Sequence, residues 1–171
     1  MQRMKGLAIA AGMVLLTGFN STAQQTAPKP KPAAPAKHVM LTADELKWGP
    51  GPESLPPGGQ AAVLSGDPGK SGMFTIRLKM PDGYTVPPHS HPTAEHVTIV
   101  SGTLMMAMGS KLDDAAFKPM TAGAYAVMPA RSDHYVRAKG ETIVQVMAMG
   151  PFEIKYANPN DDPRKKTTTK N

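Results

Sequence analysis

Residues 83–102 read GYTVPPHSHPTAEHVTIVSG, and this stretch decides how the rest of the chain is interpreted. His89 and His91 are two residues apart, so on a β-strand both imidazoles point to the same face. Glu95 is an even number of residues beyond His89, so on a continuous strand its carboxylate reaches that face too. The stretch therefore predicts a cluster of two imidazoles and one carboxylate.

Two neighbouring residues bear on this cluster. Pro92 lacks a backbone N–H and can interrupt the ladder between His91 and Glu95, so the shared face requires the strand to continue through it. His96 is out of phase and is expected to point away from the site. Imidazole and carboxylate ligands suit Zn, Mn, Fe, Ni or Cu, and burying them together without a cation is costly. The alternative is a pair of exposed loop histidines with no shared partner.

The sequence around this stretch has the pattern of short strands separated by turns. In residues 73–80, Phe74, Ile76 and Leu78 alternate with polar residues. No segment from residue 38 onward shows sustained helical periodicity, and Thr42 begins at most one helical turn. This pattern predicts an all-β sandwich or barrel. Further strands are expected at 38–41, 60–64, 95–100, 103–108, 124–128, 134–138, 142–149 and 152–156.

These residues resemble the first motif of the cupin superfamily, which reads glycine, five residues, His-x-His, three or four residues, Glu, six residues, glycine. Every position of the motif is met, by Gly83, His89, His91, Glu95 and Gly102. The resemblance covers about residues 60–150. It implies a cupin-type double-stranded β-helix (jelly-roll), a conical barrel of two antiparallel sheets with one divalent metal ion near one mouth.

Residues 123–138, GAYAVMPARSDHYVRA, resemble the second cupin motif, with its first glycine, its proline and its histidine in place. Arg131 stands where glycine is usual and Ala138 where asparagine is usual. A bulky cation at a tight turn puts the geometry of this loop in question. The resemblance implies that the metal ligands are His89, His91, Glu95 and His134.

The two ends of the chain differ in composition from its middle. Residues 1–23 have a basic start, an apolar run and small residues before Ala23, as in a signal peptide cleaved after Ala23. The apolar run is too short for a permanent span, so we expect no stable membrane insertion, with an uncleaved anchor as the alternative. The protein is then periplasmic or secreted. The expected divisions are a Pro/Ala/Lys-rich linker (24–37), the β-barrel domain (38–160) and a basic disordered tail (161–171).

Charge and cysteine content narrow the choice of partners and ligands. The formal net charge of +6 comes from the ends, because residues 38–160 hold ten Lys and Arg against eleven Asp and Glu. The folded part is thus nearly neutral, and nucleic-acid binding is not expected. The chain has no Cys, so a metal has to be held by nitrogen and oxygen ligands.

Two features leave alternatives open. Trp48 begins the Pro/Gly-rich loop 48–59; we favour a role in plugging one end of the core over a loop that covers a pocket mouth. The chain also has 13 methionines, which we expect to fill an irregular barrel interior. Methionine-rich copper binding is the alternative for them. The methionines in predicted strands are Met105, Met106, Met108, Met147 and Met149.

For function, the first hypothesis is a metal-dependent oxygenase or oxidase of a small organic molecule, with Glu95 able to leave the ion and act as a base. The candidates for orienting a substrate are Tyr125, Arg131 and Tyr135, whose alternative roles are packing or a surface turn. The second hypothesis is an isomerase, a lyase or a dismutase on the same site, and the third is a non-enzymatic binder of a metal or small ligand. A homodimer is expected by analogy with other cupins.

Overall fold

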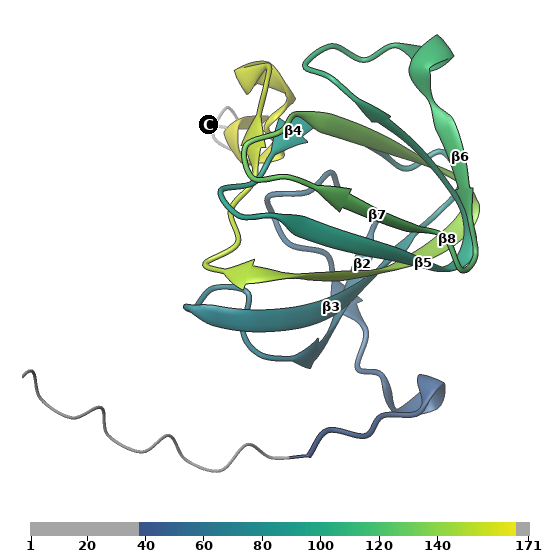
Figure 1. Ribbon diagram of the computed structural model, residues 1–171, viewed down its shortest axis with the longest axis vertical. Coiled ribbons are helices and arrows are strands. Elements are labelled where there is room, and N and C mark those ends of the chain that lie inside the picture. The colour runs from purple at the N-terminus through teal and green to yellow at the C-terminus, as the bar shows by residue number, and fades with distance from the viewer. Residues whose placement is uncertain (1–37, 167–171) are drawn as a thin grey trace, which may run out of the picture. The chain divides into compact units, whose positions relative to one another are not determined.

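A computed structural model describes residues 38–166, and these form mostly β-strands (Figure 1). The strands are β1 (Gly49–Pro50), β2 (Gln60–Ser65), β3 (Gly72–Met80), β4 (Thr85–Ser90), β5 (Glu95–Met108), β6 (Lys118–Thr121), β7 (Tyr125–Met128), β8 (His134–Gly150) and β9 (Lys155–Tyr156). Within the described residues, the helical elements are three 3-10 turns, η1 (Ala43–Glu45), η2 (Asp114–Ala116) and η3 (Pro159–Asp161), and α1 (Pro163–Lys166). The all-β class is confirmed. The predicted signal peptide and linker lie outside the described residues.

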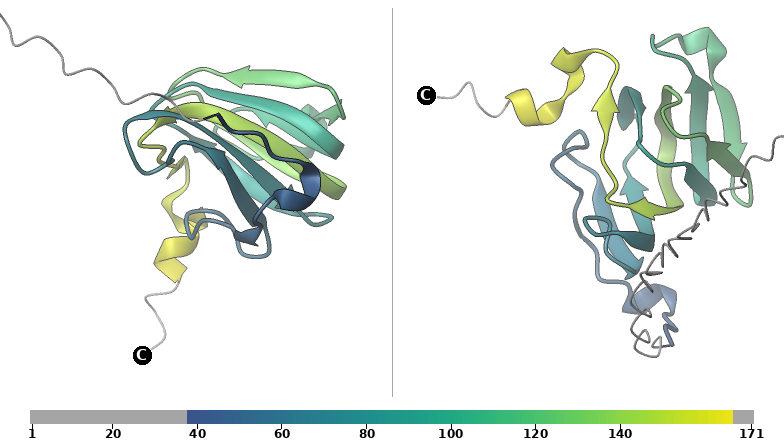
Figure 2. Two further views of the ribbon diagram at one scale, coloured as in Figure 1. Left: turned by 90° about the horizontal axis from the view of Figure 1, so that it is seen from below. Right: turned by 60° about the vertical axis from the view of Figure 1, so that its left-hand side comes forward.

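The two long strands, β5 and β8, build the barrel. They pair antiparallel with each other along their lengths. The second half of β8 also pairs with β3, while its first half pairs with β4. β2 and β1 extend the β3 side, β9 extends the β4 side, and β5 pairs further with β6 and β7. Two antiparallel layers therefore share β5 and β8 and curve around one interior (Figure 2).

β5 passes from one layer to the other at Gly102. The φ angle there is +76°, and the pairing register of β5 with β8 shifts twice between Ile99 and Thr103. A Cβ atom on Gly102 would lie 2.3 Å from the carbonyl oxygen of Glu141, so no other residue fits without a backbone shift. The sequence predicted two strands within β5 and two within β8. Each pair is one bent strand, because backbone pairing resumes beyond the bend.

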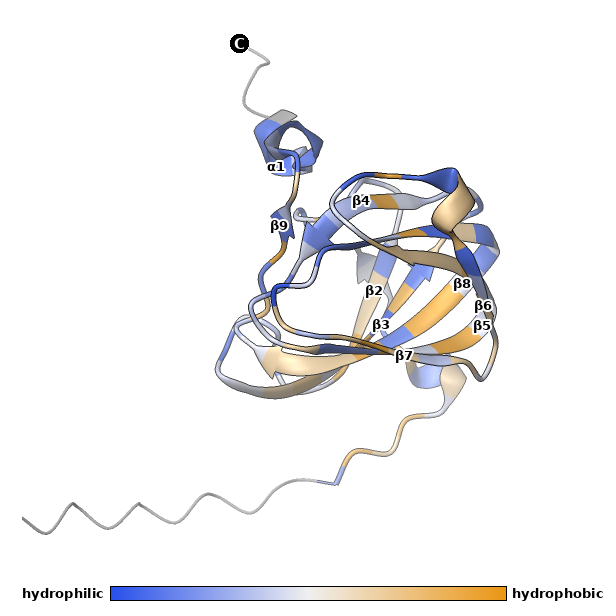
Figure 3. Cartoon of the chain, turned by 45° about the horizontal axis from the view of Figure 1, so that its top comes forward, coloured by the Kyte–Doolittle hydropathy of each residue, from blue (hydrophilic) through white to orange (hydrophobic). Residues whose placement is uncertain are grey.

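The core follows the expected alternation along the strands. Phe74 and Ile76 of β3 are buried, and Leu78 packs against them from a half-buried position. The inward residues of β5 and β8 include Val97, Leu104 and the other apolar side chains that meet them. Hydrophobic segments accordingly follow the strands that enclose the interior (Figure 3). The barrel interior is thus apolar apart from the histidine cluster described below.

Several predicted elements differ from the structure. Residues 38–41 form no strand and are exposed, although Thr42 does begin the expected helical turn, with its N–H donating to Glu45 Oε2 at 2.8 Å. Strands β4 and β6 were not among the predicted strands. Both contain proline, which is uncommon within a sheet: Pro87 and Pro88 in β4, and Pro119 in β6. The predicted strand at 152–156 is reduced to β9.

Most of the strand methionines do not fill the interior. Met106 is buried, but Met108, Met147 and Met149 are exposed. The expectation failed because Met147 and Met149 occupy the outward phase of β8, opposite in phase to buried Val146. The methionines of β8 therefore cover an outer face of the barrel.

Trp48 lies outside the buried core cluster and is half-buried, with Lys79 Nζ 4.5 Å from its ring centre. The favoured role as a core plug is therefore not supported. The loop that follows it, including Leu55, instead lines the cavity inside the barrel, as the alternative predicted.

The start of the predicted basic tail has defined contacts. The Arg164 guanidinium donates to the Asp162 carboxylate at 2.8 Å and to the carbonyl oxygen of Ile154 at 3.1 Å. Arg164 therefore links this end of the chain to Ile154, and the predicted tail beyond residue 166 lies outside the described residues. Among residues 38–166, no helix is both long and apolar enough to cross a bilayer.

Candidate metal centre

The four predicted ligands reach one place from three strands. His89 is near the end of β4 and His91 directly follows that strand, whereas Glu95 and His134 are the first residues of β5 and β8. The chain turns between His91 and Glu95, so the continuous strand used to predict their shared face does not exist. Glu95 reaches the cluster because β5 begins beside it, so the argument from strand phase was wrong, although the four predicted side chains do meet.

The three histidines present their Nε2 atoms to one another. The Nδ1 atoms of His89 and His91 lie 2.7 Å from the carbonyl oxygens of Pro87 and Glu153. His134 Nδ1 lies 3.1 Å from the carbonyl oxygen of Ser132. A carbonyl only accepts hydrogen bonds, so each Nδ1 donates a proton to its carbonyl, and a neutral ring then has its lone pair on Nε2. One ring nitrogen from each histidine lies within 4.8 Å of the others, as a shared metal requires.

Glu95 closes the cluster on one side. Its Oε2 lies 3.2 Å from His134 Nε2 and 3.6 Å from His91 Nε2. All four side chains are buried, and His91 Nε2 has no hydrogen-bond partner. A buried polar atom without a partner is costly, and a cation at this point would satisfy it. The residues present therefore fit a divalent metal ion.

Electrostatics keep the histidines in the form that binds metals. Burial lowers the pKa of His89 well below its usual 6.5, and the nearby imidazoles of His134 and His91 lower it further. Burial also lowers the pKa of His91, against the opposing effect of the Glu95 carboxylate. At neutral pH His89 and His91 are therefore neutral, with lone pairs available for a cation.

Packing fixes the orientation of the imidazole rings. The ring of Phe152 stacks on His91 with a centroid distance of 4.2 Å and an interplanar angle of 13°. On the other side, the ring of Tyr156 lies 6.0 Å from that of His89. Backbone carbonyls and aromatic rings thus hold the site in place before any ligand binds.

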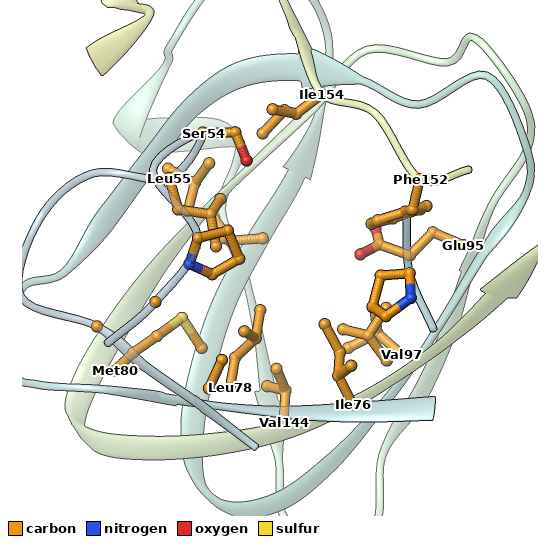
Figure 4. A pocket seen from close by; sticks show the side chains of 18 of the residues that line it. Ser54, Leu55, Ile76, Leu78, Met80, Glu95, Val97, Val144, Phe152 and Ile154 are labelled. Carbon is orange, nitrogen blue, oxygen red and sulfur yellow. The ribbon is translucent and has the colours of Figure 1, made fainter. Parts of the chain in front are cut away.

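The cluster lies in the wall of a cavity of about 240 Å³ inside the barrel. The walls are mostly aliphatic, and Ile76, Leu78 and Val144 face Ser54, Leu55 and Ile154 across it (Figure 4). Glu95 points its carboxylate into this space beside Phe152 (Figure 4). The histidine cluster is therefore a polar site, suited to a metal ion, in the wall of an otherwise apolar cavity.

The three predicted substrate-orienting residues do not line this cavity. Tyr125 is exposed, and its hydroxyl lies 2.5 Å from Nδ1 of the outward-pointing His96. Tyr135 is buried elsewhere, where its hydroxyl donates to the Asp113 carbonyl and accepts from the Asp113 N–H, both at 3.1 Å. Arg131 lines a separate, more polar pocket that also reaches His91. His96 was expected to point away, and it does.

Sequence reasoning missed the residues that hold the loop over the cavity. The hydroxyl of Tyr84 donates to the carbonyl oxygen of Pro56 at 2.5 Å, and that of Tyr156 donates to the carbonyl oxygen of Ser54 at 2.7 Å. No sequence signal marks these contacts, because the partners are backbone atoms of a loop far along the chain. The nearness of Tyr84 to the first motif was the only available hint.

The barrel and the buried histidine cluster define a cupin. The chain belongs to the ChrR cupin-like domain family, whose match covers residues 36–153. No curated protein matches the sequence.

Solved structures with the same fold carry several activities. A candidate acetylacetone dioxygenase from Methylibium petroleiphilum is 18% identical, with a TM-score of 0.59 over 78% of this chain and 90% of that one. The polyketide cyclase RemF from Streptomyces resistomycificus is 15% identical, with a TM-score of 0.57 over 78% and 94%. A cupin sugar phosphate isomerase from Silicibacter pomeroyi is 19% identical, with a TM-score of 0.53 over 68% and 80%. At these identities the likeness establishes the cupin fold alone.

Proposed function

We propose that this chain is a divalent-metal-dependent enzyme that converts a small, mostly apolar organic molecule inside the barrel. One observation carries the proposal: three buried histidines bring ring nitrogens within 4.8 Å of one another in the wall of an apolar cavity. A protein that only stored metal would have no need of a substrate-sized chamber beside the ion.

The ligands would be His89, His91, His134 and Glu95. A bound divalent ion would supply a Lewis acid and, if redox-active, a centre for oxygen chemistry. The protein's own part is to exclude water with the aliphatic walls and to orient the substrate against the histidine cluster. The cavity volume suits a ligand of modest size, and the scarcity of charged groups in its walls favours an uncharged one.

Oxygenase or oxidase chemistry is the reaction class we propose. The likeness to a candidate dioxygenase agrees with this class, although the cyclase and the isomerase have the same fold. One observation favours a redox-neutral alternative: Glu95 Oε2 contacts two imidazoles and faces the cavity. A carboxylate in that position is able to take a proton from a substrate carbon, as in an isomerase or lyase.

We also propose that the protein acts after export, on the basis of the signal-like residues 1–23. The mass of the protein recovered from cells tests this proposal, because cleavage after Ala23 leaves a chain that begins at Gln24. An intact N-terminal Met1 on the folded protein would contradict it.

Elemental analysis tests the metal centre. Untagged wild-type protein should contain close to one divalent ion per chain, and the His91→Ala variant should contain much less. His38→Ala is the control, because His38 is exposed and distant in the chain from the cluster. Negligible metal in the wild type as well as the variant would overturn the proposal. Oxygen uptake by the loaded enzyme with small apolar ketones or phenols then separates oxygenase chemistry from redox-neutral turnover.

A further inference from the structure

The outer face of the barrel gathers sulfur ligands at one end of the sheet. Met73 is 63% exposed, Met147 38% and Met149 50%, although methionine is usually a core residue. Met73 of β3 and Met149 of β8 are direct partners across the two strands. Met147 is two residues from Met149, so the three thioethers extend from the same face of neighbouring strands.

A histidine completes this group from the next strand. His96 of β5 is the direct cross-strand partner of Met147. Partners of this kind have Cβ atoms about 5 Å apart, which is within reach of a flexible methionine side chain. The four residues thus lie next to one another across β3, β8 and β5, in the order Met73, Met149, Met147, His96.

The imidazole of His96 is held in a suitable orientation. Its Nδ1 lies 2.5 Å from the hydroxyl oxygen of Tyr125, on the neighbouring strand β7. When Nδ1 carries the proton and donates to that oxygen, Nε2 is free to bind a metal. A metal-binding histidine commonly has such a partner on its second nitrogen.

We propose that this face carries a binding site for Cu(I), formed by Met73, Met147, Met149 and His96. Thioether sulfur and imidazole are the soft and borderline ligands that select Cu(I). None of the four is a carboxylate, which disfavours hard cations such as Mg²⁺ or Ca²⁺. The site is distinct from the metal centre, because these residues occupy the outward phase of the strands whose inward residues line the cavity.

Competition for Cu(I) with a chromogenic chelator tests the proposal, and it requires only the protein, the chelator and metal ions. Wild-type protein whose inner histidine cluster is first saturated with Zn(II) should remove Cu(I) from the chelator, and the Met147→Leu/Met149→Leu variant treated in the same way should lose this ability. Leucine keeps the volume and the apolar character, so the fold is retained. Met108→Leu is the matched control, because Met108 is 53% exposed on β5 but outside the group, and it should bind like the wild type. Tyr125→Phe should weaken binding by about tenfold.

Methyl NMR with Ag(I), a diamagnetic substitute for Cu(I), locates the ion. The methyl signals of Met73, Met147 and Met149 should shift together, and those of Met80 and Met106, which line the inner cavity, should stay in place. Shifts confined to the inner pair would overturn the proposal, as would unchanged Cu(I) binding in the double variant. It would also fail if the outer methyl signals moved only with protein concentration, because this face would then be a contact between two copies of the chain.

Discussion

Glu95 Oε2 lies 3.2 Å from His134 Nε2, although the two residues belong to opposite ends of the ladder that joins β5 and β8. Glu95 pairs with Ala148 at one end and His134 pairs with Met108 at the other. A flat sheet would hold them far apart. The contact therefore exists because the ladder bends at Gly102 and the two layers close on each other.

The Glu95–His134 contact predicts the effect of Glu95→Gln. The amide keeps the shape of the side chain but removes the negative charge beside two imidazole nitrogens. Divalent metal affinity should fall by on the order of tenfold or more. Titration with Zn(II) measures this, and Glu141→Gln, which alters an exposed carboxylate, should bind like the wild type. Equal affinities in all three proteins would show that Glu95 is not a ligand.

Glycine at the bend of β5 predicts a stability difference between two substitutions. Gly102 and Gly83 have nearly the same φ angles, +76° and +73°, but only a Cβ on Gly102 meets other atoms. Gly83→Ala should therefore cost about 1–2 kcal/mol for the left-handed backbone alone. Gly102→Ala should cost clearly more, because the backbone at Glu141 has to move. Urea unfolding of both variants gives the difference, and equal losses would contradict this account of the bend.

The four residues that meet in the cluster could be predicted from the sequence because both cupin motifs place them at fixed spacings. The path of the chain between them could not. Strand β4 was not among the predicted strands, and it forms despite Pro87 and Pro88 because β8 and β9 pair with its other residues. The burial of Met147 was mispredicted for a similar reason. Alternation reveals that a residue shares a face with its neighbours but not which face turns inward, until the pairing of β8 is known.

The loop over the cavity illustrates a second limit. Its tethers join tyrosine hydroxyls to backbone carbonyl oxygens, and any residue offers such an oxygen. Composition identified the loop, and its place over the cavity was one of two alternatives. Only the structure decides between them.

Arg131 predicts a substitution that stabilises the protein. It is the one non-glycine residue among residues 38–166 with a positive φ, 62°, and its N–H donates to the carbonyl oxygen of His91 at 2.8 Å. The turn thus keeps the shape expected of glycine, at a cost of about 1–2 kcal/mol for a residue with a Cβ. Arg131→Gly removes that cost but raises the conformational entropy of the unfolded chain. A net gain of about 0.5–1 kcal/mol in the free energy of unfolding is therefore expected.

Thermal or urea unfolding of Arg131→Gly provides the measurement. Ala130→Gly is the control, because the preceding residue does not have a positive φ and gains nothing from glycine. That variant should be less stable than the wild type. A loss of stability in Arg131→Gly would mean that the arginine side chain makes a contribution larger than the backbone cost.

Tyr84 predicts how stability changes at high pH. Burial raises the pKa of Tyr84 to about 12, and its hydroxyl holds the cavity loop at Pro56. The phenol of an unfolded chain ionises near pH 10. Between pH 10 and 12 only the unfolded form loses this proton, so ionisation favours unfolding. The stabilisation is fully present below pH 10 and is lost as the pH rises through 12.

Urea midpoints measured at intervals from pH 8 to pH 12 should therefore decline more steeply for the wild type than for Tyr84→Phe. The variant should start from a lower midpoint at pH 8, because it lacks the hydrogen bond to Pro56, which is typically worth about 1 kcal/mol. Tyr125→Phe is the control, since its ring is exposed. This control should follow the wild-type pH dependence. Phenolate absorbance of the folded protein supplies an independent measurement. The wild type should contain a tyrosine that ionises only at high pH, and this tyrosine should be absent from the titration of Tyr84→Phe. Parallel curves for wild type and Tyr84→Phe would mean that this phenol stays accessible to water and that the loop does not seal the cavity there.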